Sequence, residues 1–324
     1  MAQITSAASA PPAPATARKR RFGSDNVELA ILGLPVIVWF ILFAYIPMFG
    51  ILIAFKRYRP LGENFIDSLI QSEWMGLDNF TFLFKTPDAA IFFRNTLLYN
   101  ALFIVTGIGV SVTLAIMISL IHSRRLAKTC QTLMFLPHFL SWVVVGYFVF
   151  AFLSSDKGFV NQTIKSFGGQ PVQWYVDSKY WPAFLVLINT WKTMGYSMIV
   201  YLASITGIDQ SLYEAAAIDG SSKWQQVRYI TLPMLVPIIT IMFILAVGRI
   251  FTSDFGLFYN VPRRSGPLSD VTQTIDVYVY NALMQRNNIG FAASASVTQS
   301  IIGFVTILTA NFVVSKLNPE NSLF

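Results

Sequence analysis

Leu29 to Phe55 reads LAILGLPVIVWFILFAYIPMFGILIAF and contains no Asp, Glu, Lys or Arg. A helix needs about 20 apolar residues to cross the hydrocarbon layer of a bilayer, so this stretch is long enough to span it. It is also much longer than the apolar region of a secretory signal peptide, and no small-residue cleavage site follows it. The stretch therefore predicts a membrane helix that is retained in the mature protein.

Five further apolar runs of similar length follow along the chain. Of the 324 residues, 54% are hydrophobic and 12% are charged, against about 25% charged in a soluble domain. Six helices that are apolar all round would leave a soluble protein nothing to face water. The sequence thus predicts an all-α membrane protein with about six transmembrane helices in residues 29–324. The five further runs are Leu97 to Ile121, Leu133 to Leu153, Trp181 to Ile208, Leu235 to Phe255 and Ala292 to Val314.

Residues 1–28 differ in composition from the rest of the chain. Residues 1–17 are rich in Ala, Pro, Ser and Thr and cannot bury a core, and the basic run Arg18 to Arg21 follows them, so we expect a disordered basic tail. Six spans place both termini on one side of the membrane. Lys and Arg number ten on that side and eleven on the other, which leaves the side open. The tight loop from Ser123 to Thr129 holds three basic residues and no acid, which favours both termini in the cytoplasm.

The composition excludes several classes of site. The net charge of +7 comes largely from clusters beside apolar runs, so we do not expect nucleic acid as a partner. A single cysteine, Cys130, excludes an internal disulfide framework, and with only two histidines we expect no metal site. The sequence has no Gly-x-x-x-x-Gly-Lys-Ser/Thr phosphate loop, and no group of side chains pairs a nucleophile with a base. We therefore expect neither catalysis nor a cofactor on this chain.

The segment from Ser211 to Pro233, SLYEAAAIDGSSKWQQVRYITLP, lies between the fourth and fifth runs. Ser211 and Glu214 have the spacing of a capping box, which predicts a helix start. Gly220 predicts a turn that ends this helix, because glycine adopts a left-handed backbone readily. Ser222 and Gln225 can cap a second short helix, which Leu232-Pro233 would end. The pattern predicts two short helices that lie nearly at right angles at the membrane face. Taken alone, the same pattern also fits a well-capped loop with no further role.

The amino-acid sequence of this segment resembles that of the cytoplasmic loop of binding-protein-dependent ABC importer permeases. The shared residues are Glu214-Ala215-Ala216, Gly220 and Ile230-Thr231-Leu232-Pro233, while Ser221 and Val227 replace the Ala and Phe that are frequent in the family. Other motifs are similar to the oligosaccharide and polysaccharide branch, and most of all to a permease of an alginate importer. These motifs are Gly76 to Phe80, Asn95-Thr96, Leu136-Pro137, Ser141-Trp142, Trp191-Lys192 with Gly195, and Tyr278 to Tyr280.

The resemblance implies a type I ABC importer permease fold in a bacterial inner membrane. It implies as partners a second permease subunit, two ATPase subunits that hold ATP and Mg, a periplasmic solute-binding protein and a saccharide substrate. The loop of about residues 209–233 would dock on an ATPase subunit and transmit its closure. In that role Glu214 contacts the ATPase, the Asp219-Gly220 pair makes the bend, and an apolar face fills the ATPase cleft. That face comprises Leu212, Ala215 and Ile218, and Ala216 lies beside it.

Two cations stand out inside the apolar runs, Lys192 in the fourth and Arg249 in the fifth. Ionisable residues in spans usually face a cavity or a partner. We expect them to line a cavity for a carboxylated sugar, together with Asn189, Trp191, Tyr196 and Asp254. The alternative is structural: Lys192 extends its charge toward the membrane surface or caps a neighbouring element, and Arg249 pairs with Asp254.

An ion-coupled secondary transporter is the main alternative function, and a structural membrane scaffold is another. Secondary transporters often carry a carboxylate relay at mid-membrane. The predicted spans contain no pair of Asp or Glu residues, and this alternative leaves the loop of residues 214–233 unexplained.

Overall fold

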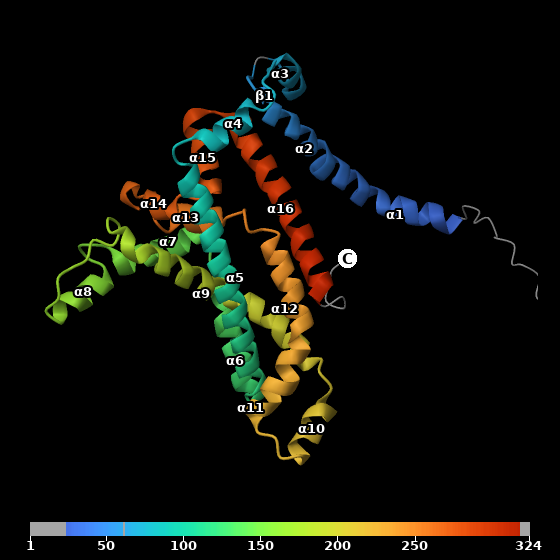
Figure 1. Ribbon diagram of the computed structural model, residues 1–324, viewed down its shortest axis with the longest axis vertical. Helices are drawn as coiled ribbons and strands as arrows, with labels where there is room; N and C mark the ends of the chain where they lie inside the picture. Colours follow the sequence, from blue (N-terminus) through green and yellow to red (C-terminus); the bar gives the residue numbers. More distant parts are fainter. Residues whose placement is uncertain (1–23, 61, 318–324) are drawn as a thin grey trace, which may run out of the picture. The chain divides into compact units, whose positions relative to one another are not determined.

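The computed structural model describes residues 24–60 and 62–317 (Figure 1). The chain divides into two compact units, residues 1–50 and 51–324. Of the predicted tail, residues 1–23 lie outside the described part, whereas residues 24–28 are helical and begin α1. The helix therefore starts several residues earlier than the apolar run.

The described residues of the first unit, 24–50, form one long, largely exposed helical segment. It contains α1 (Ser24–Phe40), a π-helical turn η1 (Ile41–Tyr45) and α2 (Ile46–Met48), and a 3-10 stretch η2 (Phe49–Phe55) follows. Pro47 has no N–H to donate to the preceding turn, and the π-helical turn comes directly before it. Residues 28–55 are long and apolar enough to span a membrane. No residue of their most apolar window is buried within the chain. An apolar surface of this kind requires lipid or a partner helix.

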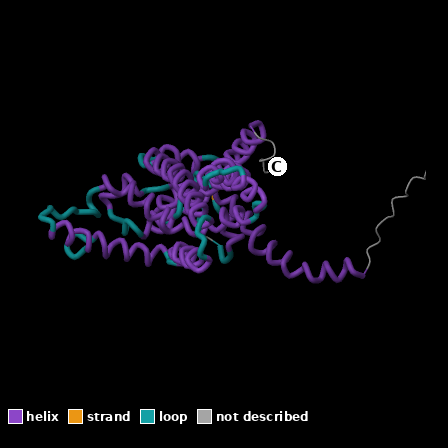
Figure 2. Tube along the Cα trace, turned by 90° about the horizontal axis from the view of Figure 1, so that it is seen from below, coloured by secondary structure: helices purple, strands orange, loops and turns teal. Residues whose placement is uncertain are grey.

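The second unit is mostly helical, and loops and turns connect its helices (Figure 2). Its only strands within the described residues are β1 (Lys56–Arg57) and β2 (Glu73–Trp74), which pair antiparallel. The other elements are α3 (Phe65–Gln71), α4 (Asp78–Lys85), α5 (Ala89–Ser119), α6 (Arg124–Phe135), η3 (Leu136–Phe139), α7 (Trp142–Leu153), α8 (Phe159–Ser166), η4 (Ser178–Tyr180), α9 (Trp181–Thr206), α10 (Gln210–Ile218), α11 (Lys223–Gln226), η5 (Val227–Thr231), α12 (Leu232–Val247), α13 (Phe255–Asn260), η6 (Gly266–Leu268), α14 (Ser269–Thr272), α15 (Ile275–Arg286) and α16 (Ile289–Leu317).

Four helical segments of the described chain are long and apolar enough to span a membrane, and a bent pair makes a fifth. The single spans are residues 28–55, 89–119, 223–247 and 289–316. The third predicted run is bent by 98° between η3 and α7, because Pro137 and the capping residue Ser141 interrupt it. The fourth run forms α9, 26 residues long, but it carries too many polar residues to count as an apolar span.

The fifth predicted run, Leu235 to Phe255, is displaced in the structure. The helix starts at Lys223 and ends at Val247, and residues 248–254 form a non-helical turn before α13. Arg249 therefore lies in a turn at the end of a span rather than inside one. Val271, Ile275, Val279 and Leu283 recur at helical spacing in the sequence, but they lie on two helices, α14 and α15, which are separated at Gln273-Thr274.

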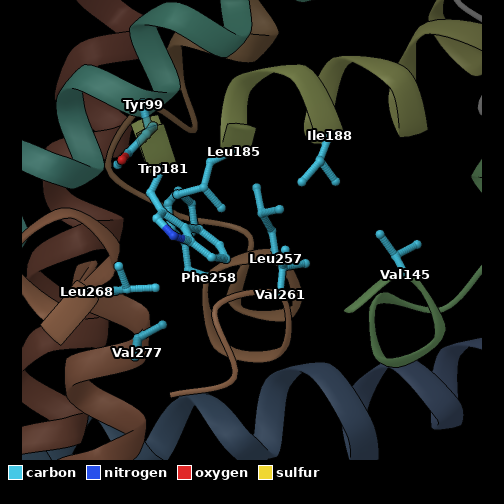
Figure 3. Packing of buried hydrophobic residues seen from close by; sticks show 10 residues of the cluster. All are labelled: Tyr99, Val145, Trp181, Leu185, Ile188, Leu257, Phe258, Val261, Leu268 and Val277. Atoms are coloured by element: carbon cyan, nitrogen blue, oxygen red, sulfur yellow. The ribbon is translucent and has the colours of Figure 1, made fainter. Parts of the chain in front are cut away.

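Packing centres on α5 and α9, which contact each other along much of their lengths (Figure 1). The first residue of α9, Trp181, is fully buried and its indole N–H donates to the Trp174 carbonyl. Leu257 and Val261, from α13 and the residue after it, are also fully buried in this cluster (Figure 3). The cluster fixes the α13 segment against the N-terminal end of α9, whereas α10 follows the C-terminal end of α9.

Candidate coupling loop and transport pathway

Helix α10 begins at a different residue from the one that the sequence predicts. Asp209 is its N-cap, with Oδ1 accepting from the Ser211 N–H at 2.9 Å. The predicted capping box of Ser211 and Glu214 is therefore wrong. The Ser211 N–H stabilises the charged form of Asp209 and lowers the pKa of this carboxyl.

The turn after α10 is confirmed at Gly220. Its φ of +81° is left-handed, a conformation that residues with a Cβ rarely adopt. Ser221 N donates to Ala216 O at 2.9 Å, and Gly220 N donates to Ala217 O at 3.1 Å. These two bonds form a Schellman motif, which satisfies carbonyl groups at the helix end. The turn redirects the chain directly into α11.

The capping of α11 by Ser222 and Gln225 is also confirmed. Gln225 N donates to Ser222 Oγ at 3.3 Å, and Ser222 N donates to Gln225 Oε1 at 2.7 Å. However, Leu232-Pro233 does not end this helix. The π-helical turn η5 joins α11 to α12, and Leu232 N donates to Val227 O, so the missing N–H of Pro233 causes no break. The second short helix is thus the first part of a span.

Helix α10 presents an apolar row to its surroundings. Leu212, Ala215 and Ile218 are all exposed, with Ile218 at 86%. They recur every three residues and so share one side of the helix. On another side, the Tyr213 hydroxyl lies 2.9 Å from Thr231 Oγ1 and connects α10 to η5. Glu214 is exposed and forms no ion pair within the described residues.

A cleft of about 430 Å³ lies among α5, α9, α12 and the turn of residues 248–254. Three of the six predicted pathway residues line it: Asn189, Arg249 and Asp254. Further polar residues of its wall were not predicted, because they belong to segments that read as apolar spans: three lie on α5 and α9, and two lie in the turn of residues 248–254. These are Asn100, Thr193, Ser197, Thr252 and Ser253.

Arg249 and Asp254 do not pair, although both line the cleft. Asp254 Oδ2 accepts from the Trp142 indole N–H at 2.8 Å, and its Oδ1 caps α13 through the Leu257 N–H at 3.3 Å. The Arg249 guanidinium makes no hydrogen bond or ion pair in the described part of the chain. Arg249 also lines a second cavity of about 540 Å³ between α12 and α16. Its charge is therefore available to a ligand.

Lys192 is engaged elsewhere. Its Nζ donates to the His138 carbonyl at 3.1 Å and lies 5.0 Å from the Trp142 ring centroid. Tyr196 stacks on the His138 ring at 5.0 Å, and neither Trp191 nor Tyr196 lines the cleft. Lys192 and Tyr196 therefore contact the bend between η3 and α7. This arrangement matches the alternative in which Lys192 caps a neighbouring element.

The turn that carries Arg249 is fixed by polar side chains from three helices. Asn100 of α5 donates to the Ile250 carbonyl at 2.9 Å. Asp276 of α15 accepts from Ser253 N at 2.6 Å and from Ser253 Oγ at 2.7 Å. Gln299 of α16 donates to the Phe251 carbonyl at 2.9 Å. No periodicity in the sequence marks Asp276 for this position.

The chain matches known transport proteins over most of its length. Residues 107–319 match the family described as binding-protein-dependent transport system inner membrane component. The polygalacturonan/rhamnogalacturonan transport system permease protein YteP of Bacillus subtilis (strain 168) is 33% identical over 90% of this chain and 89% of that protein. The lactose transport system permease protein LacF of Rhizobium radiobacter is 30% identical over 81% of this chain and 89% of that protein.

Solved structures confirm the fold. A crystal structure of a bacterial ABC transporter involved in the import of the acidic polysaccharide alginate contains a chain with a TM-score of 0.81 and 30% identity, covering 91% of this chain and 97% of that one. A second crystal structure, of a bacterial alginate ABC transporter in complex with an alginate pentasaccharide-bound periplasmic protein, has a TM-score of 0.80. The fold and the family resemblance predicted from the loop motif are thereby confirmed, and the chain belongs to the family of binding-protein-dependent transport system inner membrane components.

Proposed function

We propose that this chain is the permease subunit of an ATP-driven importer that moves carboxylated oligo- or polysaccharides across a bacterial inner membrane. The observation that carries the proposal is Arg249, a cation with no ion-pair partner among the described residues, which faces a cleft walled with amide and hydroxyl groups. The names of relatives point the same way, since polygalacturonan and alginate are both polymers of carboxylated sugars.

The chemistry of the cleft suits an acidic sugar. A guanidinium binds a carboxylate through two parallel N–H···O hydrogen bonds, and the electrostatic attraction is stronger away from bulk water. Asn189 and Thr193 from α9 and Asn100 from α5 supply groups that can bond to sugar hydroxyls. The cleft thus combines one charge for the carboxylate with several neutral partners for the ring substituents.

Energy for transport comes from outside the chain in this proposal, because the sequence has no phosphate-binding loop. The exposed row of Leu212, Ala215 and Ile218 would dock on one of two ATPase subunits that hold ATP and Mg. Glu214 would contact that subunit beside the row, and the Gly220 turn would pass the movement directly into the span of residues 223–247. The proposed assembly also contains a second permease subunit and a periplasmic protein that delivers the substrate. Both termini of this chain would lie in the cytoplasm.

The test is uptake by the complete importer, purified with its partner subunits and reconstituted in vesicles. We expect ATP-dependent uptake of uronic-acid oligosaccharides, and Arg249→Gln should reduce that uptake at low substrate at least tenfold while uptake of neutral oligosaccharides changes little. Arg125→Gln, which removes an exposed arginine of α6, is the matched control. Unchanged uronate uptake by Arg249→Gln would contradict the substrate assignment, and uptake driven by an ion gradient without ATP would support a secondary transporter instead.

A further inference from the structure

Another pocket, of about 220 Å³, lies between α7 and the turn that follows α13. Gly146 and Tyr147 line it from α7, and Tyr259, Arg263 and Arg264 line it from the other side. The proposed transport cleft has a separate lining, and no motif of the sequence draws attention to this pocket.

Both arginines of this pocket lie against aromatic rings. The Arg263 guanidinium carbon is 4.0 Å from the Phe150 ring centroid and 5.5 Å from that of Tyr147, and the Arg264 guanidinium carbon is 5.3 Å from that of Tyr259. Such cation–π contacts orient a guanidinium but use none of its N–H donors. Neither guanidinium forms a hydrogen bond or an ion pair with any described residue. Two adjacent positive charges therefore face the pocket without a carboxylate to balance them.

The backbone that carries the arginines is strained. Arg263 has a φ of +56° and Arg264 a φ of +54°, which are unfavourable for residues with a Cβ. Arg263 N donates to Asn260 O at 3.2 Å, and Ser265 Oγ donates to Tyr175 O at 2.6 Å. Two left-handed non-glycine residues in succession persist only where the surroundings fix them, and such strain is concentrated at functional sites.

Helix α7 and the buried core hold this turn in place. A Cβ on Gly146 would lie 2.8 Å from Asn260 O, so α7 packs directly on the backbone of the turn. Val261, next along the chain, is fully buried in the cluster around Trp181 (Figure 3). The two guanidiniums therefore project from a rigid support.

The pocket is close to the transport cleft along the chain. Asp254 lines the cleft, and Tyr259 of the pocket follows it within α13, a helix of six residues that rises about 9 Å. Phe255 and Tyr259 stack with their ring centroids 4.7 Å apart. Helices α7 and α13, whose residues line the pocket, lie toward the N-terminal end of α9 and away from α10 (Figure 1). In the proposed orientation this is the side from which substrate arrives.

We propose that Arg263 and Arg264 form an entry site that binds the carboxylate of one sugar unit while neighbouring units of the same chain reach the cleft at Arg249. This inference rests on the proposed function. The guanidiniums supply N–H donors for a carboxylate, and the faces of Tyr147 and Tyr259 supply surfaces for the apolar side of a sugar ring. The pocket is smaller than the about 300–1,000 Å³ of typical ligand sites, so it accommodates one unit rather than an oligosaccharide.

The test compares concentration series for uptake by the complete importer in vesicles of zwitterionic lipid. In the Arg263→Gln/Arg264→Gln variant, we expect the half-saturating concentration of a uronic-acid oligosaccharide to rise at least tenfold, with that of a neutral oligosaccharide of equal length unchanged. The Lys157→Gln/Lys165→Gln variant removes the same charge from two exposed positions in the segment before α9 and should behave as wild type. If the glutamine variant does not assemble, Arg263→Lys/Arg264→Lys keeps the charge but loses the paired donors, and a rise of at least threefold is expected.

Four results would overturn the inference. An unchanged half-saturating concentration, in a protein that still takes up uronates, removes the entry site and leaves the proposed function intact. An equal loss for neutral and acidic oligosaccharides, or a loss that depends on anionic lipid in the vesicles, assigns the arginines to structure or to a lipid phosphate. If the wild-type importer takes up no acidic oligosaccharide, the proposed function fails and the entry site with it.

Discussion

Lys192 and Arg249 are both cations within predicted apolar runs, but their neighbourhoods in the structure differ. Lys192 Nζ bonds to the His138 carbonyl and lies over the Trp142 ring, so its charge is used within the chain. Arg249 has no such partner among the described residues and borders two cavities. The difference teaches that a charge in an apolar run indicates a role without deciding which one. The neighbouring carbonyl and carboxylate groups decide whether the cation supports the fold or remains available to a substrate.

One residue connects the two neighbourhoods. The Trp142 ring lies under Lys192, and its indole N–H donates to Asp254, which lines the same cleft as Arg249. The bend in the third span is therefore linked to the wall of the cleft. Substitutions on either side should separate effects on folding from effects on substrate charge.

The largest expected effect is at Gly195, on the Lys192 side. A Cβ at this position would lie 2.0 Å from the Met134 carbonyl oxygen, so Gly195→Ala forces α9 away from α6. We expect a loss of about 3 kcal/mol of stability and reduced uptake of every substrate. Thermal unfolding in detergent would measure this, with Gly109→Ala as the control, because a Cβ on Gly109 meets nothing within 4 Å. Equal melting temperatures for the two variants would contradict this close packing.

The next effect is expected at Asp276, on the Arg249 side. Asp276→Ala removes the carboxylate that accepts hydrogen bonds from Ser253 N and Ser253 Oγ. Because Ser253 is buried, water cannot readily replace this acceptor. We expect a loss of about 2 kcal/mol of stability, and a preferential loss of uronate uptake because the Arg249 turn is released. Asp270→Ala on α14 is a control, since its carboxylate makes no bond within the described part of the chain. Wild-type uronate uptake by Asp276→Ala would show that the turn does not depend on this carboxylate.

Lys192→Gln should have a smaller effect of a different kind. It removes a charged hydrogen bond and a cation–π contact at a half-buried site, worth about 1 kcal/mol together. We expect uptake of neutral and acidic oligosaccharides to fall by the same factor, in contrast to Arg249→Gln. The ratio of the two uptake rates is the measurement, and a selective loss of uronate uptake would place Lys192 in the pathway.

Local signals in the sequence predicted two features of the loop of residues 209–233 well, the turn at Gly220 and the cap of α11. Gly220 and the Ser222–Gln225 cap depend on residues within three or four positions of each other, and both are confirmed. The start of α10 was mispredicted because Asp209, two residues upstream, caps it in place of Ser211. The continuation of α11 into α12 was missed because proline usually ends a helix, whereas the π-helical turn before Pro233 accommodates it.

The cleft was less predictable because it depends on contacts between distant segments. Asn189, Arg249 and Asp254 line one cleft in the structure, but polarity alone could not separate them from Lys192 on another side of α9. Asp276 reaches the Arg249 turn only through the packing of α15. The roles of all these residues in substrate recognition remain predictions.

The smallest effect on stability, and the sharpest test of the comparison, is expected from Trp142→Phe. Phenylalanine keeps a ring beneath Lys192 but cannot donate to Asp254, which costs about 0.5–1 kcal/mol. The released carboxylate can then turn toward Arg249 and neutralise its charge, so we expect the half-saturating concentration of a uronic-acid oligosaccharide to rise about threefold, because a paired guanidinium binds a second carboxylate less well.

Adding Asp254→Asn to Trp142→Phe should restore the wild-type value, because asparagine can still cap α13 but carries no charge. If the double variant stays impaired while neutral oligosaccharides are taken up normally, the effect of Trp142 does not pass through Asp254. Restoration would establish that Arg249 is available to substrate because the indole of the bend keeps the nearby carboxylate occupied.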